Sequence, residues 1–531
     1  MKQYITVDTY NGKVLLRELV DGKNSSKKLE FEPTLYVECK KETDYKNFYQ
    51  TKNVGPVEFE NMFDMYNFVK ESEGEELYGT SNMVTQFLNS TEFDEPVLSN
   101  VVYAILDIEV CSGWFDDDNK WHDGGFPKPS EAEWPITAIT DYRSDDKKYH
   151  VFSTAKWDSS KSLLKYKDEI DYHYYESEED LLEGYLKFFK KNYPHVITGW
   201  NSKNFDITYI VNRIKNVLGE DKVKLLSPWK MVESKKTKGF TGEFIDTYKI
   251  YGIQHLDYLD IYKKFLLKPR EKYTLAYISS VELKDEHKLE FTGTHATLYY
   301  DDPQFFVDYN IQDVRCVVLF EKKFKFLNLT FMLGYYALQN FEDVLSPVKT
   351  WENLLYKIYM SKHIVPPYPT KDHPEKSAYA GAYVFEVDPG LKNCVVSYDF
   401  ASLYPSIIRQ HYIGPDVIIK DTKYNEMYSE LVQILEDNKE LELLEEVKGK
   451  CINEYYISHR HLPKCVSDFL KKHNVTMTTN VQFFDKSKKS WFVQSVTDLY
   501  KERKANKKEA FKHELAAEAI SKVLKSRGVN I

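Results

Sequence analysis

The sequence predicts a multidomain α/β protein, with an α+β arrangement over the chain as a whole. Three observations carry this prediction. A length of 531 residues suggests roughly three or four domains. An apolar content of 42% is sufficient for hydrophobic cores. Between residue 101 and about residue 325, apolar strand-like runs alternate with amphipathic helix-like segments, which is the pattern of an α/β domain.

The α/β region begins with an apolar strand over 101–110, and a second strand over 195–202 leads into a helix that Gly219 ends. Between the two strands, 176–192 is predicted to be an amphipathic helix. Its acids come early and its lysines late, which suits the helix dipole. A long helix over 303–324 closes the region.

The segments around this region are assigned from periodicity, turn residues and charge. The expected elements are a small sheet-containing domain over 1–100, a hairpin around Gly239–Gly242, a mixed segment over 326–370 with a helix that ends before Pro366, strands over 380–387 and 392–400, a charged helical stretch with a solvated face over 425–450, and a basic helix within 481–531.

The overall charge of −10 argues against a protein that coats nucleic acid non-specifically, but not against one with a local basic groove. No Cys-x-x-Cys pair, signal peptide or membrane-length apolar run is present in the sequence, so we expect a cytoplasmic protein with reduced thiols and no membrane partner. The spacing of Cys451, His459, His461 and Cys465 resembles no standard zinc site, and a polar loop is the favoured interpretation.

Four carboxylates and a tyrosine form the first candidate site. Asp107 and Glu109 lie two apart at a strand end and share one face, while Asp206 opens a helix after the next strand. Tyr309 and Asp313 lie at i and i+4 on one helix face. Such carboxylates can hold two divalent metals, and a phenol one turn away can hydrogen-bond an attacking water.

The first pair alone is weak evidence, because an acid-x-acid spacing is common by chance in a chain with 82 acidic residues. The order of the motifs is more specific. D-I-E at 107–109, G-W-N-x-x-x-F-D at 199–206 and Y-x-x-x-D at 309–313 resemble the three motifs of the proofreading 3′→5′ exonucleases in B-family DNA polymerases.

This resemblance implies a ribonuclease-H-like exonuclease domain. It implies that two Mg²⁺ or Mn²⁺ ions bind Asp107, Glu109, Asp206 and Asp313, and that Tyr309 positions the attacking water. By the same resemblance, Asn201 and Phe205 contact the frayed DNA strand.

A second candidate site follows an apolar run, where 399–407 reads D-F-A-S-L-Y-P-S-I. Asp399 and the carbonyl of Phe400 are suitable metal ligands, and backbone N–H groups around Ser402 and Leu403 can hold a triphosphate. The segment resembles motif A of B-family polymerases, which implies two metal ions at this site as well. The resemblance further implies that Tyr404 lies beneath the sugar of the incoming nucleotide and excludes a 2′-hydroxyl.

Further segments resemble the same family. Y-A-G-A-Y at 379–383 resembles a template-gripping motif that includes Tyr379 and Gly381. The segments 256–265 and 346–355 resemble the T-even bacteriophage branch. Arg503 and Lys507 share one face of the expected basic helix and resemble the cations that hold the incoming deoxynucleoside triphosphate.

The family resemblance predicts an N-terminal domain over 1–102 rejoined by 326–370, an exonuclease domain over 103–325, a partial palm over 371–480 and a first fingers helix over 481–531. After Asp399 the sequence contains neither K-x-x-x-N-S-x-Y-G nor D-T-D-S, the two motifs that complete a polymerase site. We therefore expect either a split DNA-directed DNA polymerase in DNA replication, whose C-terminal half is a separate chain, or a fragment of a longer polymerase chain, and the split is the favoured explanation. The expected partners are primer-template DNA, a single-stranded 3′ end and dNTP.

Two other hypotheses remain open. One is a stand-alone 3′→5′ exonuclease whose palm segment only grips DNA. The other is a catalytically idle fragment that binds DNA or RNA. The intact carboxylate set argues against the idle fragment, and the intact triphosphate motif argues against the stand-alone nuclease. Contacts with a sliding clamp stay open.

Overall fold

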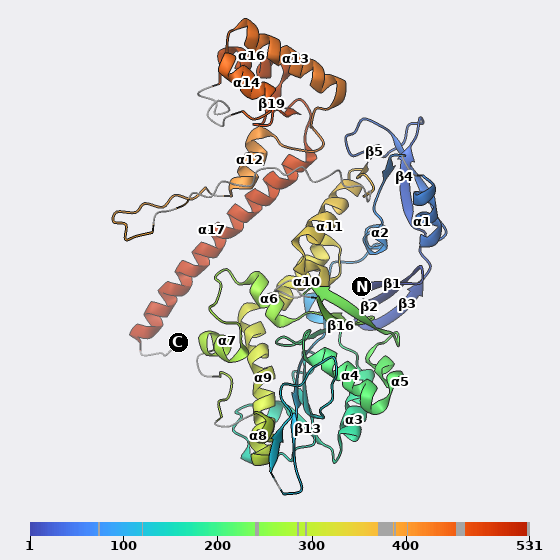
Figure 1. The fold of residues 1–531 in the computed structure, drawn as a ribbon, viewed down its shortest axis with the longest axis vertical. Coiled ribbons are helices and arrows are strands. Elements are labelled where there is room, and N and C mark those ends of the chain that lie inside the picture. The colour runs from blue at the N-terminus through green and yellow to red at the C-terminus, as the bar shows by residue number, and fades with distance from the viewer. Residues whose placement is uncertain are drawn as a thin grey trace. The chain divides into compact units, whose positions relative to one another are not determined.

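The computed structural model describes residues 1–72, 75–118, 120–238, 244–283, 286–291, 295–369, 386, 389–400, 402–452 and 462–527. The chain forms two compact units, one made of 1–36 and 56–362 and the other of 37–55 and 363–531. Figure 1 shows the elements along the chain. The domain boundaries expected near residues 102, 325, 370 and 480 stay predictions.

A six-stranded mixed sheet organises the first unit, with the strand order β13-β12-β11-β8-β14-β17. β8 lies inside the sheet, antiparallel to β11 and parallel to β14. The strands are β8 (Tyr103–Val110), β11 (Ile136–Arg143), β12 (Tyr149–Ser153), β13 (Ile170–Tyr174), β14 (Val196–Thr198) and β17 (Gln254–His255). The strands predicted over 101–110 and 195–202 are confirmed as β8 and β14.

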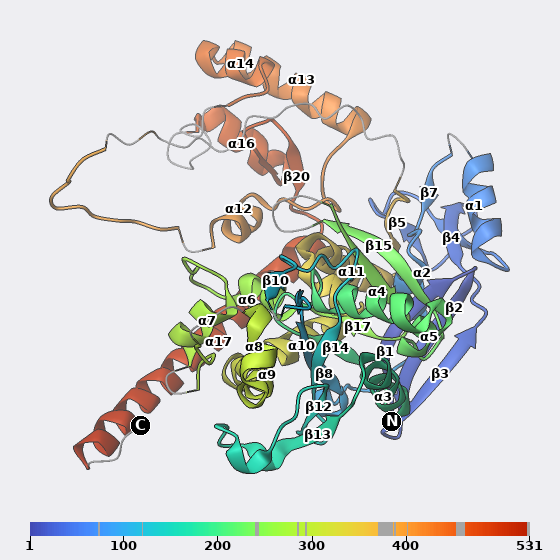
Figure 2. The ribbon, with the colours of Figure 1, turned by 60° about the horizontal axis from the view of Figure 1, so that its bottom comes forward.

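Helices cover both faces of this sheet, as Figures 1 and 2 show. α9 (Pro303–Phe324) packs on β8 and β11, whereas α3 (Glu178–Lys191) packs on β12 and α4 (Asp206–Leu218) on β8. Side chains alternate between the two faces. Ile105 belongs to the core on the α9 side, and Leu106 belongs to the core on the α3–α4 side. Asp107 therefore faces α9.

A second sheet, β1-β2-β3, shares the core on the α9 side. Its strands are β1 (Lys2–Tyr10), β2 (Lys13–Val20) and β3 (Lys23–Leu29). Buried Arg17 of β2 donates hydrogen bonds to the carbonyl oxygens of Tyr193, Pro194 and Gly252, at 2.6, 2.6 and 2.9 Å. The guanidinium thus ties this sheet to the loops that precede β14 and β17.

The other described elements of residues 1–362 are shorter or lie around these sheets. They are β4 (Thr34–Glu38), β5 (Lys46–Asn47), β6 (Val54–Glu58), α1 (Met62–Glu71), β7 (Leu77–Tyr78), α2 (Met83–Ser90), β9 (Gly113–Phe115), β10 (Trp121–Asp123), α5 (Glu220–Val223), β15 (Val232–Lys238), β16 (Phe244–Ile250), α6 (Tyr258–Phe265), α7 (Leu275–Glu282), α8 (His295–Asp301), α10 (Phe326–Ala337) and α11 (Pro347–Met360). β15 and β16 pair antiparallel as the hairpin prediction required, and the tip at 239–243 lies outside the described residues.

The second unit contains a small helical core. Its elements are β18 (Ile364–Val365), α12 (Leu403–His411), α13 (Asp421–Asp437), α14 (Leu441–Lys448), α16 (Lys464–His473), β19 (Val475–Met477), β20 (Phe483–Asp485) and α17 (Trp491–Ser526). The helical prediction for 425–450 is confirmed, and most charged side chains of this stretch are exposed as expected, but its helices also bury an apolar face that was not predicted. Met427, Leu431 and Leu435 recur every four residues and are buried against α14 and α16.

The strand expected over 392–400 is not formed. Residues 391–400 are irregular and exposed. A strand needs a hydrogen-bonding neighbour, and no described strand pairs with this segment. The other strand expected beside it, 380–387, lies outside the described residues apart from residue 386.

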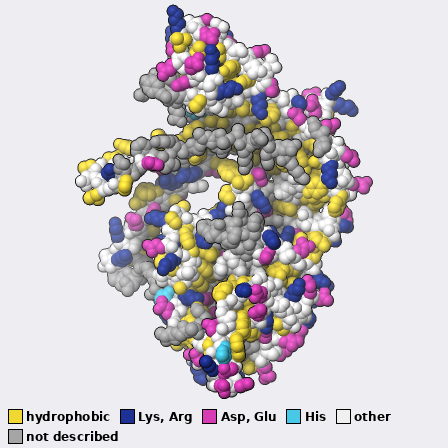
Figure 3. Space-filling model, in the orientation of Figure 1, with side chains coloured by type: hydrophobic (Ala, Val, Ile, Leu, Met, Phe, Trp, Pro, Cys, Tyr) yellow, Lys and Arg dark blue, Asp and Glu magenta, His cyan; other side chains and the backbone are white. Residues whose placement is uncertain are grey.

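The surface mixes both charge signs. Figure 3 shows Lys and Arg side chains interspersed with Asp and Glu over the face that it draws, in keeping with the net charge of −10. α17 is 36 residues long, mostly exposed and rich in lysine, which confirms the helix predicted in the basic C-terminal segment. Among the helices that the structure describes, none combines the length and the apolar character needed to span a membrane.

Candidate active site

β8 places the first two carboxylates side by side at the centre of the sheet. Asp107 lies opposite Thr140 of β11, and Glu109 lies opposite Ala138. Both side chains are partly buried and point toward α9, because strand residues two apart share a face. This is the arrangement that the D-I-E motif predicted.

The third carboxylate reaches the same strand from α4. Asp206 is the first residue of this helix, and its Oδ1 accepts a hydrogen bond of 3.0 Å from the backbone N–H of Ile108. The loop before it passes very close to β8. A Cβ on Gly199 would lie 2.4 Å from the carbonyl oxygen of Leu106, so this position accepts only glycine without rearrangement.

The loop is held by a buried carboxylate that the sequence prediction missed. Asp257 accepts hydrogen bonds of 3.0 Å from the N–H groups of Asn201, Lys203 and Leu259. Asn201 itself adopts φ +66°. Burial raises the pKa of Asp257 to about 7, with a further contribution from Asp260. Local sequence gave no signal for this role, because Asp257 is far from the loop along the chain.

α9 supplies the fourth carboxylate and brings an amide with it. The carboxylate oxygens of Asp107, Glu109 and Asp313 form a group whose members all lie within 4.8 Å of one another. The Nδ2 of Asn310 donates a 2.8 Å hydrogen bond to Oδ2 of Asp107, and the hydroxyl of Thr140 donates to Oδ1 of Asn310. Asn310 was also missed, although it lies between the two residues of the Y-x-x-x-D motif.

A lysine from the irregular segment between α7 and α8 completes the cluster. The ammonium of Lys288 pairs with Asp313 and lies 4.4 Å from the ring centroid of Tyr309. Phe291 packs edge-on against the same ring, with centroids 5.6 Å apart. Burial raises the pKa of Tyr309, and the neighbouring Asp313 raises it further, so the phenol keeps its proton at neutral pH.

Burial raises the pKa of all four carboxylates. Burial, followed by Asp206 and Asp313, raises the pKa of Asp107. Burial and Asp313 raise the pKa of Glu109 to about 8, and burial raises that of Asp206 to about 7. The pKa of Asp313 rises only to about 6, since Lys288 offsets part of the effect of burial.

These residues fit hard divalent cations. Mg²⁺ and Mn²⁺ prefer oxygen ligands, and three carboxylates face one another across a short distance. Oδ1 of Asp313 is buried and accepts no hydrogen bond from any described residue, as expected for an oxygen that binds a metal ion. Asp206 lies outside the tight group but adjoins it through Ile108.

Phe205 and Asn201, the two residues predicted to contact the DNA strand, lie in the loop that leads to Asp206. Phe205 precedes α4, and its ring packs against Tyr209 and against Phe126, with centroids 5.5 and 5.7 Å apart. Phe126 is 78% exposed. Asn201 lies four residues earlier in the same loop. An exposed ring beside a partly buried one, next to a carboxylate site, is suited to stacking on unpaired bases.

The second candidate site is assembled only in part. Asp399 and Phe400 are exposed, and Asp399 belongs to neither of the two potential metal-binding groups found in the described part of the chain. Ser402, in the left-handed conformation with φ 55°, precedes α12, which begins at Leu403. The guanidinium of Arg503 on α17 donates a 2.6 Å hydrogen bond to the hydroxyl of Ser402.

The remaining predicted residues of this site are solvent-facing or lie outside the description. Tyr404 is 75% exposed, and Lys507 is exposed one turn after Arg503 on α17. Tyr379 and Gly381 lie outside the described residues, as does most of the expected template-gripping segment.

The cysteine–histidine cluster lies only in part within the described residues. Cys451 is exposed and Cys465 is partly exposed. His459 and His461 lie outside the described residues.

Comparison with known proteins finds matches to one protein family in two parts of the chain. The model for "DNA polymerase family B, exonuclease domain" matches residues 93–278, and the model for "DNA polymerase family B" matches residues 346–526. The first range includes Asp107, Glu109 and Asp206, and the second includes Asp399, Arg503 and Lys507.

Individual relatives align over most of this chain. A DNA-directed DNA polymerase of Enterobacteria phage T4 is 30% identical over 98% of the chain, and one of Escherichia phage RB69 is 33% identical over 78%. A DNA polymerase of Thermococcus sp. (strain GE8) is 26% identical over 58% of the chain. The chain spans about half the length of the two phage relatives, 55% and 47% respectively. It belongs to the B family of DNA polymerases.

Proposed function

We propose that this chain removes nucleotides from the 3′ end of single-stranded DNA by two-metal hydrolysis. The observation that carries the proposal is the cluster of Asp107, Glu109 and Asp313, whose oxygens lie within 4.8 Å of one another at the end of a rigid strand. Asp206 adds a fourth carboxylate beside the cluster.

In this proposal each residue has a separate task. Asp107, Glu109, Asp206 and Asp313 hold two Mg²⁺ or Mn²⁺ ions. When bound, the ions lower the pKa of the attacking water and stabilise the leaving 3′ oxygen. The protonated phenol of Tyr309 orients that water, and Asn310 fixes the carboxylate of Asp107. Phe205 and Phe126 stack on the bases of the frayed strand, and Asn201 contacts its backbone.

The test is degradation of 3′-labelled single-stranded DNA with Mg²⁺ by the wild-type chain and by Asp107→Ala. We expect the variant to lose the metal-dependent activity. Asp168→Ala serves as a matched control, because Asp168 is an exposed acid of the same unit. If the wild-type chain leaves the label intact in Mg²⁺ and in Mn²⁺, the nuclease proposal fails and a DNA-binding or RNA-binding role becomes the better explanation.

We also propose that the region around Asp399 is part of a nucleotidyl-transfer site. Asp399 and the Phe400 carbonyl hold metal, and Ser402, Leu403 and Tyr404 hold the dNTP. The hydrogen bond between Arg503 and Ser402 supports this, because it brings a cation to the end of α12 where the triphosphate is to bind. Lys507 lies exposed one turn further along α17 and is proposed as a second cation for the triphosphate.

The proposed polymerase site needs a second carboxylate. Residues 400–531 contain no Asp-Thr-Asp-Ser, so we propose that a partner polypeptide carrying the C-terminal part of the polymerase supplies it. Residues 1–531 alone are then expected not to extend a primer. Primer extension with dNTP, with and without that polypeptide, tests this. Extension by residues 1–531 alone would contradict the proposal. A well-formed complex that degrades DNA but fails to extend would favour a stand-alone exonuclease.

A further inference from the structure

Two histidines and an aspartate meet on the sheet face opposite the exonuclease carboxylates. β12 and β13 pair in parallel with His150 opposite Asp171 and Phe152 opposite His173, so all four side chains point to one side. Phe152 belongs to the core on the α3–α4 side, whereas Val151 belongs to the core on the α9 side. This cluster is therefore separate from Asp107, Glu109 and Asp313.

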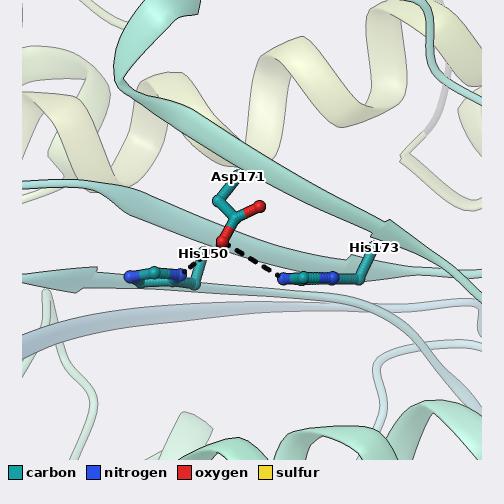
Figure 4. A group of neighbouring side chains, drawn as sticks. All are labelled: His150, Asp171 and His173. Atoms are coloured by element: carbon teal, nitrogen blue, oxygen red, sulfur yellow. Dashed lines mark ion pairs between the residues drawn. The ribbon is translucent and has the colours of Figure 1, made fainter.

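The three polar groups have the spacing of metal ligands. Oδ2 of Asp171 lies 3.3 Å from Nδ1 of His150 and 3.5 Å from Nε2 of His173. All three ligand atoms lie within 4.8 Å of one another. Two ligand atoms bound at about 2.1 Å to a tetrahedral zinc ion lie about 3.4 Å apart. In Figure 4 the ring nitrogens of the two histidines point toward each other, with the Asp171 oxygen above the gap between them.

Hydrogen bonding leaves the inner nitrogen of His150 available. Its Nε2 lies 2.8 Å from Oδ2 of Asp146, and a proton at Nε2 donates to this carboxylate. The lone pair on Nδ1 then faces Asp171. Nδ1 is buried and has no hydrogen-bond partner among the described residues. A nitrogen lone pair and a carboxylate oxygen 3.3 Å apart repel each other unless a cation lies between them.

The surroundings hold the rings in place and leave the cluster open on one side. Phe188 of α3 packs against His150 with centroids 4.5 Å apart, and Phe152 stacks on His173 at 5.0 Å. His150 is buried, whereas the side chains of Asp171 and His173 are 47% and 39% exposed. An ion can therefore enter from solvent and keep a water as its fourth ligand.

We propose that His150, Asp171 and His173 bind a zinc-like transition-metal ion, with Asp146 as the carboxylate that orients His150. Two imidazoles favour Zn²⁺, Co²⁺ or Ni²⁺ over Mg²⁺, whereas the all-oxygen exonuclease cluster favours Mg²⁺ or Mn²⁺. Two of the ligands lie on β13, the edge strand of the sheet. The bound ion ties this edge to β12 and stabilises the exonuclease sheet.

The test uses the full 531-residue chain with Asp107→Ala and Glu109→Ala, which removes two of the three clustered exonuclease carboxylates and weakens metal binding there. Zn²⁺ binding is measured by calorimetry, and Co²⁺ binding is followed by its visible absorption. We expect one Zn²⁺ per chain at this site and a rise in Tm on its addition. In the same background, His173→Gln should weaken that binding at least tenfold and remove the rise in Tm.

Two further variants make the result specific. Asp146→Asn removes only the orienting carboxylate and should weaken binding about 10- to 100-fold. His513→Gln is the matched control, because His513 is an exposed histidine of α17 and should leave binding unchanged. If no Zn²⁺ binds in this background, or if His173→Gln changes neither affinity nor stoichiometry, the cluster is only an ion pair between a protonated histidine and two aspartates, and the proposal is wrong.

Discussion

Replacing Asn310 tests whether the amide that touches Asp107 is part of the nuclease machinery. Leucine branches at the same carbon as asparagine but cannot donate to Oδ2 of Asp107, which accepts the 2.8 Å hydrogen bond from Nδ2. A hydrogen bond to a charged group contributes about 1.5–3 kcal/mol. If that energy is realised in the transition state, Asn310→Leu slows hydrolysis about 10- to 150-fold.

The assay is single-turnover degradation of 3′-labelled single-stranded DNA at saturating Mg²⁺, with thermal unfolding measured beside it. The control is Thr140→Val, which removes the hydroxyl that donates to Asn310 but leaves the amide in contact with Asp107. We expect a loss of less than tenfold for the control. A folded Asn310→Leu protein that degrades DNA at the wild-type rate would show that the amide only fills space, and that the proposed positioning role is wrong.

Three more predictions follow from buried charge. The raised pKa of Glu109, about 8, means that its protonated form stabilises the metal-free fold below the usual carboxyl pKa, and this stability is lost as the pH rises through 8. Tm of the metal-free chain should therefore fall from pH 6 to pH 9, less so in Glu109→Gln, and Mg²⁺ should restore it. Lys288→Met removes the cation that lowers the pKa of Asp313, so nuclease activity should drop more at pH 6.5 than at pH 8.5, and equal losses at both would contradict the assignment. Arg17→Met leaves three buried carbonyl oxygens without their donor and should cost about 3 kcal/mol of unfolding free energy; a change in Tm below 1 °C would refute the tie between the sheets.

Elements with complete local signals could be predicted from the sequence. α9 was expected over 303–324 and forms over Pro303–Phe324. Asp302 accepts the cap hydrogen bond, Pro303 takes the first turn, and the apolar spacing continues to the end. The motif carboxylates were predictable for a related reason, because strand ends and helix starts fix where Asp107, Glu109 and Asp206 point.

Features that depend on distant partners could not be predicted in this way. Lys288 comes from an irregular segment and enters the cluster only because α7 and α9 pack together. Asp257 lies 56 residues from the loop that it holds through Asn201. The apolar residues of 392–400 suggested a strand. A strand also needs a neighbouring strand to pair with, and a local sequence pattern cannot show whether one is present. The charged face of 425–450 is solvated as expected, but the many acids of this stretch concealed the regular spacing of Met427, Leu431 and Leu435, which form a buried face.

The hydrogen bond between Ile108 and Asp206 affects how the site tolerates sequence change. Its donor is a backbone N–H, so any apolar residue that fills the core position of Ile108 preserves it, whereas proline removes it. Substitution of one apolar residue by another at position 108 therefore leaves the distance between Asp206 and the carboxylates of β8 unchanged. Position 199 is the opposite case, because any side chain there meets the Leu106 carbonyl. A saturation library of positions 108 and 199 should therefore accept the apolar residues that fit the core at 108 and almost none other than glycine at 199.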